Sequence, residues 1–308
     1  MVGKVSNDCV VSYHHNIHTC GVARFNRRLA DHIGVPMVFV SEVRARRFLN
    51  PIVSVKSSEM VRGEQDDFLH QLVDVNYDLL IHDYQSTDFE NQLLTRATRA
   101  MALTAELASR AREVRPDVIS GFAVASYTAS PSQFDPDLRM ITFGMAHKIQ
   151  SSGYQRVGEL LSRTGLTFVL EISSALHEGT QFDDSFFEVG EEISECFQGN
   201  VDFLGFLADQ EVVRRLVRAS AMLAFFPRGA RENNTSIISA MNLGVPVITN
   251  LDNWSPSWMV HGETVFDINQ LHDFPTSESL LKVGNSGMEA VKGLTFEQLL
   301  DLLKQDQE

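Results

Sequence analysis

Short apolar runs alternate along the chain with stretches whose apolar residues recur at helical spacing. The run at 5–13 is rich in valine and predicts a first strand. Val22, Phe25 and Leu29 follow on one stripe of a helix expected at 21–32, because residues three, four and seven apart share a helix face. Alternating strands and helices are typical of a parallel sheet flanked by helices, so the sequence predicts an α/β fold.

The same alternation continues to the end of the chain. Further strands are expected at 37–40, 78–82, 99–103, 140–143, 166–171, 201–204, 221–226 and 245–249. Further helices are expected at 66–73, 155–163, 211–218, 236–243 and 296–303. One more is expected between the strand at 99–103 and Arg112, where it ends. Thr19 is the expected N-cap of the first helix and Gly34 its expected C-terminal stop.

A break in this alternation predicts two domains. The segment after residue 125 contains Pro131 and Pro136 among Ser, Thr, Gln and Asp, a composition typical of a linker. We therefore expect Rossmann-like domains at 1–135 and 136–308, facing across a cleft, with the last helix either in the second domain or packed back on the first. Ligands of such sheets lie beyond the carboxyl ends of the strands.

Composition and charge narrow the classes of function. The 308 residues have 44% hydrophobic and 21% charged residues and a net charge of −14, which argues against a nucleic-acid partner. Arginines cluster at Arg44, Arg46 and Arg47, as on a solvated helix face; weak contact with a membrane surface is the alternative. The N-terminus lacks the features of a signal peptide, so we expect a cytoplasmic protein, and a homo-oligomer or a partner protein stays open.

The segment 221–250 contains the clearest candidate for ligand binding. A buried strand is followed by a polar loop and by a helix that begins near Thr235 or Ser236. The free amides and the positive dipole end of such a helix favour a phosphate, and Asn233 and Asn234 add side-chain donors. The alternative is a helix that is merely capped, without a ligand.

Histidines mark a second candidate region, in the N-terminal half. His14, His15 and His18 precede Gly21, which follows the first strand and permits close approach of a ligand to the backbone. Imidazoles are common metal ligands, but no carboxylate or cysteine completes a set, so we expect them to line a ligand site without a metal. Arg24 on the first helix faces either an anionic ligand or solvent.

A histidine also ends the strand expected at 78–82. His82 at the carboxyl edge of the sheet would hold a ligand hydroxyl or transfer a proton, with Asp83 orienting it. The alternative is a strand-end histidine whose hydrogen bonds are satisfied by its neighbours.

Four segments resemble the group 1, family 4-like retaining glycosyltransferases, which have the GT-B fold. They are TCGVARFNRRLADHIGVP, NVDFLGFLADQEVVRRLVRASAMLAFFP, AMNLGVPVIT and SPSWMVHGETVFDI, in the order and at nearly the spacing of that family. The likeness implies a donor site for a nucleotide sugar in the C-terminal half and an acceptor site in the N-terminal half. The acceptor site would contain His14, His15, His18, Arg24 and Asp83, and His82 would contact the donor sugar or the acceptor.

The resemblance also implies roles for single residues. The paired glutamates of the family correspond to Arg231 and Ser239, with Glu232 one residue from the first position. His147 and Lys148 stand near the family's lysine position and would neutralise the departing diphosphate, while Phe206 would lie near the base. The implied catalytic residues are therefore His82, Lys148 and Glu232.

Together with these features, the resemblance implies a metal-independent hexosyltransferase that needs no cofactor. Its donor would be UDP- or GDP-linked, its acceptor a glycan, a lipid or a small molecule, and transfer would proceed with retention. Two alternatives stay open: a catalytically silent binding or partner subunit, and a sugar-nucleotide epimerase.

Overall fold

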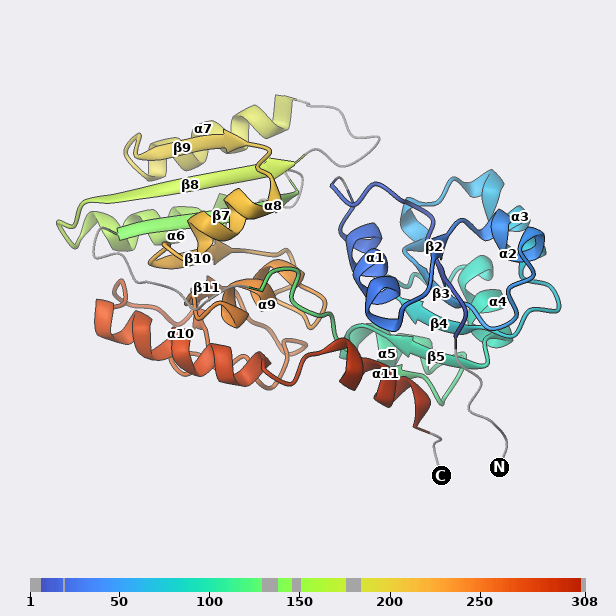
Figure 1. The fold of residues 1–308 in the computed structure, drawn as a ribbon. Helices are drawn as coiled ribbons and strands as arrows, with labels where there is room; N and C mark the ends of the chain where they lie inside the picture. Colours follow the sequence, from blue (N-terminus) through green and yellow to red (C-terminus); the bar gives the residue numbers. More distant parts are fainter. Residues whose placement is uncertain (1–6, 19, 129–137, 146–150, 176–183, 306–308) are drawn as a thin grey trace. The chain divides into compact units, whose positions relative to one another are not determined.

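The chain folds into two compact units. The computed structural model describes residues 7–18, 20–128, 138–145, 151–175 and 184–305 (Figure 1). Unit 1 comprises Met1–Val124 and Leu294–Glu308, and unit 2 comprises Ala125–Gly293. The predicted boundary between residues 135 and 136 lies outside the described residues.

Unit 1 contains a six-stranded sheet in which every strand pair is parallel. The strand order is β2-β1-β3-β4-β5-β6. The strands are β1 (Val10–Val11), β2 (Met37–Val38), β3 (Ile52–Val55), β4 (Asp78–Ile81), β5 (Arg99–Ala102) and β6 (Ile119–Ser120). The helices are α1 (Gly21–Ile33), α2 (Val40–Ala45), α3 (Gln65–Gln71), α4 (Asp88–Arg96), α5 (Ala105–Ala111) and α11 (Phe296–Lys304), with 3-10 turns η1 (Ser57–Glu59) and η2 (Arg62–Glu64).

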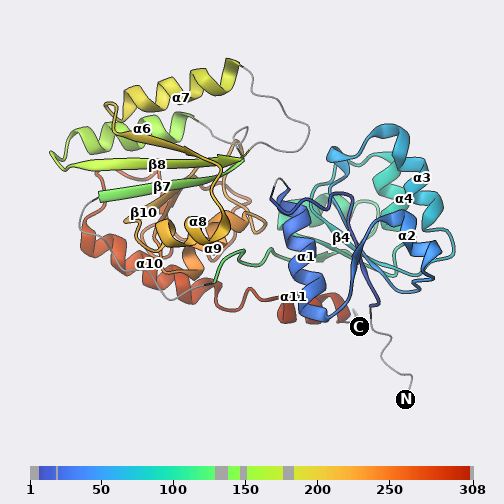
Figure 2. The same cartoon turned by 45° about the horizontal axis from the view of Figure 1, so that its top comes forward.

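Apolar residues on both faces of this sheet explain its burial between helices. All four residues of β3 and of β4 are buried, as expected for central parallel strands. The helices α2, α3 and α4 lie together over one face (Figure 2). The strand predicted at 5–13 is shorter than expected, because only Val10 and Val11 pair with their neighbours among the described residues.

Helix α1 begins at Gly21, as predicted, but its N-cap is one residue later than the predicted Thr19. Cys20 is the N-cap, and its sulfur accepts a hydrogen bond from the Ala23 amide at 3.4 Å. Thr19, the predicted cap, lies outside the described residues. Gly34 ends the helix with a φ of 73°, a left-handed conformation that favours glycine, and this prediction is confirmed.

The end of the chain returns to unit 1. Phe296 of α11 is buried, and its ring centroid lies 5.3 Å from that of Phe25 on α1. The guanidinium carbon of Arg28 lies 5.9 Å from the same Phe296 ring. These contacts place the last helix against the first.

Unit 2 repeats the architecture with a second all-parallel sheet of six strands in the order β12-β11-β10-β7-β8-β9. The strands are β7 (Leu138–Met145), β8 (Phe168–Ala175), β9 (Val201–Gly205), β10 (Ala221–Ala224), β11 (Val247–Thr249) and β12 (Phe266–Asp267). The helices are α6 (Ser151–Ser162), α7 (Asp184–Cys196), α8 (Asp209–Leu216), α9 (Thr235–Asn242) and α10 (Ser277–Val291). Figure 2 shows α6 and α7 on one face and α9 and α10 on the other. The α/β prediction is confirmed.

In the part of the chain that the structure describes, every helix is too short or too polar to span a bilayer.

Candidate functional site

Each sheet has a point where the strand order reverses, and both predicted ligand regions lie there. In unit 1 the first strand, β1, pairs with β2 on one side and β3 on the other. In unit 2 the first strand, β7, likewise pairs with β8 and β10. Loops leave in opposite directions at such a switch point, so the carboxyl ends of the two central strands border a crevice suited to ligands.

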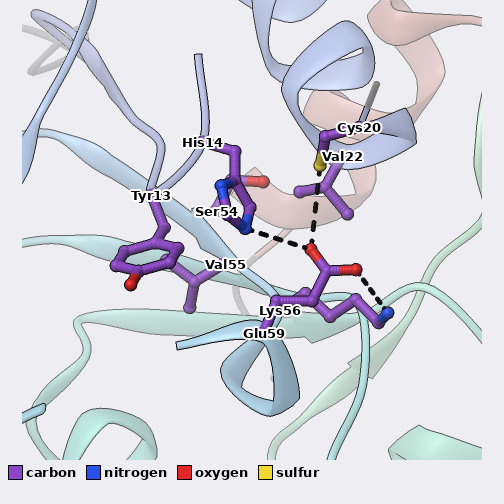
Figure 3. A pocket seen from close by; sticks show the side chains of 8 residues that line it. All are labelled: Tyr13, His14, Cys20, Val22, Ser54, Val55, Lys56 and Glu59. Carbon is purple, nitrogen blue, oxygen red and sulfur yellow. Dashed lines mark hydrogen bonds and ion pairs between the residues drawn. The ribbon is translucent and has the colours of Figure 1, made fainter. Parts of the chain in front are cut away.

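The switch point of unit 1 holds a small pocket between the loops after β1 and β3. Figure 3 shows its lining side chains, which come from β1's loop, the start of α1, and the end of β3 with η1: Tyr13, His14, Cys20, Val22, Ser54, Val55, Lys56 and Glu59. Among the side chains of this pocket, His14 alone was predicted as a site residue from the sequence.

Glu59 is the carboxylate of this pocket, and it pairs with two basic side chains. Its Oε1 lies 2.6 Å from Nζ of Lys56, and its Oε2 lies 3.6 Å from Nε2 of His14 (Figure 3). The Glu59 side chain is 14% exposed, so these partners compensate a carboxylate that water reaches only in part. The arrangement can accept hydrogen bonds from a hydroxyl or an ammonium group.

Cys20 shares the pocket but is not a nucleophile at neutral pH. Its Sγ lies 3.7 Å from Oε2 of Glu59. Burial, above all, raises the pKa of the Cys20 thiol, and the nearby Glu59 charge raises it further. The thiol is therefore protonated and serves as the helix cap. Within the described part of the chain, no three His, Cys, Asp or Glu side chains gather as metal ligands would.

His82 stands directly after β4 and is linked by a hydrogen bond to Ser54, which lines the pocket. Its Nε2 lies 2.9 Å from Oγ of Ser54, and Asn26 bonds the same hydroxyl at 2.5 Å. The Phe25 ring meets the imidazole edge-on at 5.1 Å. Desolvation lowers the pKa of His82 to about 4, although Asp83 and Glu59 oppose this, so the ring is neutral at neutral pH.

Asp83 and Glu90 fix η1, the turn that carries Glu59. Asp83 accepts hydrogen bonds from the amides of Ser57 and Ser58 at 2.8 and 3.0 Å. The hydroxyl of Ser57 donates to Glu90, whose buried carboxylate also accepts the Gln85 amide. The carboxyl group of Asp83, predicted to orient His82, thus caps the turn beside it.

The remaining candidates of unit 1, the acceptor-side His15, His18 and Arg24 and the donor-side Gly21, surround the β1 loop. His15 stacks on Phe39 with ring centroids 3.7 Å apart, and His18 is exposed. Nε of Arg24 donates to the carbonyl of Ile17 at 3.1 Å and so braces this loop. A Cβ at Gly21 would meet nothing within 4 Å, so the start of α1 borders open space.

The switch point of unit 2 contains the loop from β10 to α9. Asn234 is the N-cap residue of α9, but it makes no side-chain hydrogen bond to the first turn. Its Oδ1 instead accepts the amide of Arg231 at 2.6 Å. The amides of the first turn therefore lack the side-chain cap that Asn usually supplies. Thr235 and Ser236, both predicted donor contacts, form this turn.

Arg231 braces this loop against the segment after β11. Its two terminal nitrogens each lie 2.8 Å from a carboxylate oxygen of Asp252, a bidentate pair. The Arg231 side chain is 9% exposed, and the ion pair lowers the pKa of Asp252 despite partial burial. The guanidinium is thus held at the loop with its charge compensated.

Ser239 lies one turn deeper in α9 and is fully buried. Its hydroxyl donates to the Thr235 carbonyl at 2.5 Å and accepts the amide of Ser126 at 2.8 Å. The first bond lies within α9, and the second holds the chain that enters unit 2 against the helix. Ser239 occupies the position for which the family resemblance implies a ribose contact.

The other donor-side candidates occupy the same edge or lie outside the described residues. Glu232 and Asn233 are half-buried in the β10–α9 loop, and the Asn233 carbonyl accepts the Thr235 amide at 3.0 Å. Phe206 follows β9 and is 54% exposed. His147 and Lys148, after β7, lie outside the described residues.

Charges at the helix starts distinguish the switch-point helices from seven others in the described part of the chain. The first turns of α1, α6 and α9 contain no acidic residue. Acidic residues do occur in the first turns of α2, α3, α4, α5, α8, α10 and α11. In a chain of net charge −14, the helices that follow β1, β7 and β10 thus start without an acidic side chain that would repel an anion.

Asn26, Ser54, Lys56 and Glu59 were missed from the sequence. For the last three the reason is that β3 was not predicted, although the run IVSV after Pro51 is typical of a short buried strand. Recognising that run would have placed Lys56 and Glu59 at the carboxyl edge of the sheet.

No family model matches the chain, and no curated protein matches its sequence. Solved structures match its fold over nearly its full length. Sucrose-phosphate synthase from Thermosynechococcus elongatus superposes with a TM-score of 0.68 at 11% identity, covering 94% of this chain and 95% of that one. HepE from Anabaena, solved with UDP and glucose, gives 0.67 at 10% identity, covering 97% and 98%.

A glycosyltransferase from Rickettsia africae gives a TM-score of 0.62 at 8% identity, covering 98% of this chain and 100% of that one. These three structures are glycosyltransferases of the GT-B type. At such identities the likeness establishes the fold, so the predicted GT-B class is confirmed.

Proposed function

We propose that the chain is a glycosyltransferase that binds a nucleotide-diphosphate sugar at the switch point of unit 2. The observation that carries this proposal is the start of α9, where the Asn234 side chain turns to the Arg231 amide and the first turn has no acidic residue. Such a turn presents amides and a positive dipole end to an anion. The fold likeness to HepE, solved with UDP and glucose, supports a nucleotide diphosphate as that anion.

In this proposal the donor diphosphate contacts the Thr235–Ser236 turn, assisted by His147 or Lys148. The base lies near Phe206, whose ring is exposed after β9. A hexose, UDP or GDP as the nucleotide, retention of configuration and independence from metal ions are the finer parts of the proposal. They derive from the family resemblance.

The acceptor binds at the switch point of unit 1. Glu59, compensated by Lys56 and His14, would accept hydrogen bonds from acceptor hydroxyls. The neutral His82 would hold a further hydroxyl or take up its proton. This acceptor is a glycan, a lipid or a small molecule.

One observation favours a second function, that of a silent nucleotide-binding subunit. Where the family has its paired glutamates, this chain has Arg231, which is tied to Asp252, and Ser239, whose hydroxyl is engaged within unit 2. Neither offers the carboxylate that the family uses for sugar and ribose hydroxyls.

Donor hydrolysis and nucleotide binding test the two functions together. The protein is incubated with UDP- and GDP-linked hexoses, and release of the nucleotide diphosphate is measured. Thermal shift with UDP, GDP and ADP follows in parallel; ligand at 100 times its dissociation constant stabilises by about 2.7 kcal/mol. We expect both a shift and slow hydrolysis.

Lys148→Ala is the informative variant, and Lys292→Ala, on a side chain that is 75% exposed, is its control. Hydrolysis should fall at least tenfold in Lys148→Ala alone. A thermal shift without hydrolysis would identify the silent subunit, and the absence of both would refute the donor site.

A further inference from the structure

Four polar side chains at the switch point of unit 1 form a chain of hydrogen bonds that ends at His82. Asn26, Ser54 and Ser12 are buried, and they connect α1 with the ends of β3 and β1. Because buried polar groups must be paired, the donor and acceptor at each link can be deduced.

The orientation of the Asn26 amide follows from a backbone carbonyl. The side-chain nitrogen of Asn26, Nδ2, lies 2.9 Å from the carbonyl oxygen of Ser54, which can only accept a hydrogen bond. The same nitrogen lies 2.9 Å from Oγ of Ser12, and Ser12 donates onward to the carbonyl of His14 at 2.6 Å. The Asn26 nitrogen therefore donates both bonds, and Oδ1 must face Ser54.

The hydroxyl of Ser54 then has a single possible role toward His82. Oδ1 of Asn26 can only accept, so the one hydrogen of Ser54 is donated to it across 2.5 Å. Toward Nε2 of His82, 2.9 Å away, the same oxygen must be the acceptor. The proton of that bond therefore belongs to His82 Nε2.

We propose that Asn26 and Ser54 are positioning residues that hold His82 as the neutral Nε2–H tautomer, so that its Nδ1 can only accept a hydrogen bond. The alternative tautomer would place two acceptors, Nε2 and Oγ, 2.9 Å apart without a hydrogen between them. Burial of the ring, which disfavours the cation, agrees with this assignment.

The tautomer also bears on the ligand, provided that the proposed function holds. A ligand group that hydrogen-bonds to Nδ1 of His82 must then be a donor, such as an acceptor or sugar hydroxyl. A carboxylate or a phosphate would meet a lone pair and be disfavoured.

Nitrogen NMR of the ligand-free protein tests the tautomer directly. The full chain is labelled with ¹⁵N, and two-bond proton–nitrogen correlations are recorded at pH 7. The His82 signals are identified by their loss in His82→Gln. We expect Nε2 to appear as a protonated nitrogen and Nδ1 as a bare one; a protonated Nδ1, or two averaged nitrogens, would overturn the proposal.

Ser54→Ala and Ser12→Ala are a matched pair of variants that tests whether the hydrogen bond from His82 to Ser54 fixes the tautomer. Each removes one buried hydroxyl bonded to Asn26, but Ser54 alone contacts His82. We expect the two His82 nitrogen shifts to move toward each other in Ser54→Ala and to stay unchanged in Ser12→Ala, with thermal unfolding as the check of folding. Equal effects of both variants, or none in Ser54→Ala, would contradict a positioning role.

Should Ser54→Ala not fold, Ser54→Thr, which keeps the hydroxyl, must retain the wild-type pattern. All these spectra are recorded without nucleotide or acceptor. A failure of the proposed transferase activity therefore leaves the tautomer result intact, and the reverse also holds.

Discussion

The lowered pKa of His82 makes the free energy of unfolding depend on pH. Its folded pKa is about 4, while an unfolded histidine titrates near 6.5. Asp83 and Glu59 favour its protonation and Lys56 opposes it, but burial outweighs them. Between these two pKa values the unfolded chain binds more protons than the folded one, so the free energy of unfolding falls as the pH drops from about 6.5 toward 4.

We therefore predict that His82→Gln flattens this pH dependence. The slope that His82 contributes is at most about 1.4 kcal/mol per pH unit, and it vanishes above pH 6.5. Urea unfolding of the wild type and the variant at pH 7.5, 6 and 5 measures it. Equal slopes in both proteins would show that the imidazole is not buried as a neutral group.

The residues around His82 also show what the sequence could and could not predict. His82 was indicated because a polar residue that ends an apolar strand lies at the carboxyl edge of the sheet. Its partner Ser54 could not be found in the same way, because their proximity depends on the pairing of β3 with β4, where Ser54 is opposite Leu80. Asn26 lies a further 28 residues from Ser54 and reaches it only through the packing of α1.

In unit 2, α10 packs closely against the end of α9 because Gly284 has no side chain. A Cβ on Gly284 of α10 would lie 2.3 Å from the carbonyl oxygen of Gly244, at the end of α9. Backbone cannot yield as a flexible side chain can, so the two helices would have to separate. This contact depends on residues 40 positions apart, and α10 was not predicted from the sequence.

Gly284→Ala should accordingly destabilise the protein by about 1–3 kcal/mol or more. Gly21→Ala is the control, because a Cβ there meets nothing within 4 Å and alanine is the better helix former. Denaturant unfolding of both variants provides the comparison. Similar stabilities would contradict the described packing of α10 on α9.

A single substitution at the start of α9 should stabilise the helix and weaken the binding of a nucleotide diphosphate. Ser236→Glu adds a negative charge to a first turn that has none, which should stabilise the helix by about 0.3–1 kcal/mol. The same charge should weaken the binding of a nucleotide diphosphate at least tenfold. Ser236→Gln, similar in size but neutral, separates charge from bulk; calorimetric affinities that are equal for Glu and Gln would count against an anion at this turn.

On the scale of the whole molecule, the chain crosses from unit 1 to unit 2 and returns. The alternation of strands and helices was sufficient to predict the α/β class and the two repeats of the architecture. The assignment of 294–308 to unit 1 rests on long-range contacts such as Phe296 with Phe25, which no local pattern reveals. For that reason the sequence left the place of the last helix open.

Phe296→Ala tests this return. Removing a buried ring that is 7% exposed should destabilise unit 1 by about 3 kcal/mol and increase amide exchange in α1. Leu281→Ala, at a side chain that is 46% exposed, should change stability by less than about 0.5 kcal/mol. Unchanged exchange in α1 would show that α11 does not support it.

The proposed glycosyltransferase requires that a nucleotide diphosphate binds where β7 and β10 end in unit 2. Amide hydrogen exchange is recorded with and without saturating UDP, GDP or ADP. We expect slower exchange at residues 233–237 with at least one of these nucleotides, and no such slowing in Ser236→Glu. Unchanged exchange at 233–237 with all three at millimolar concentration would contradict it.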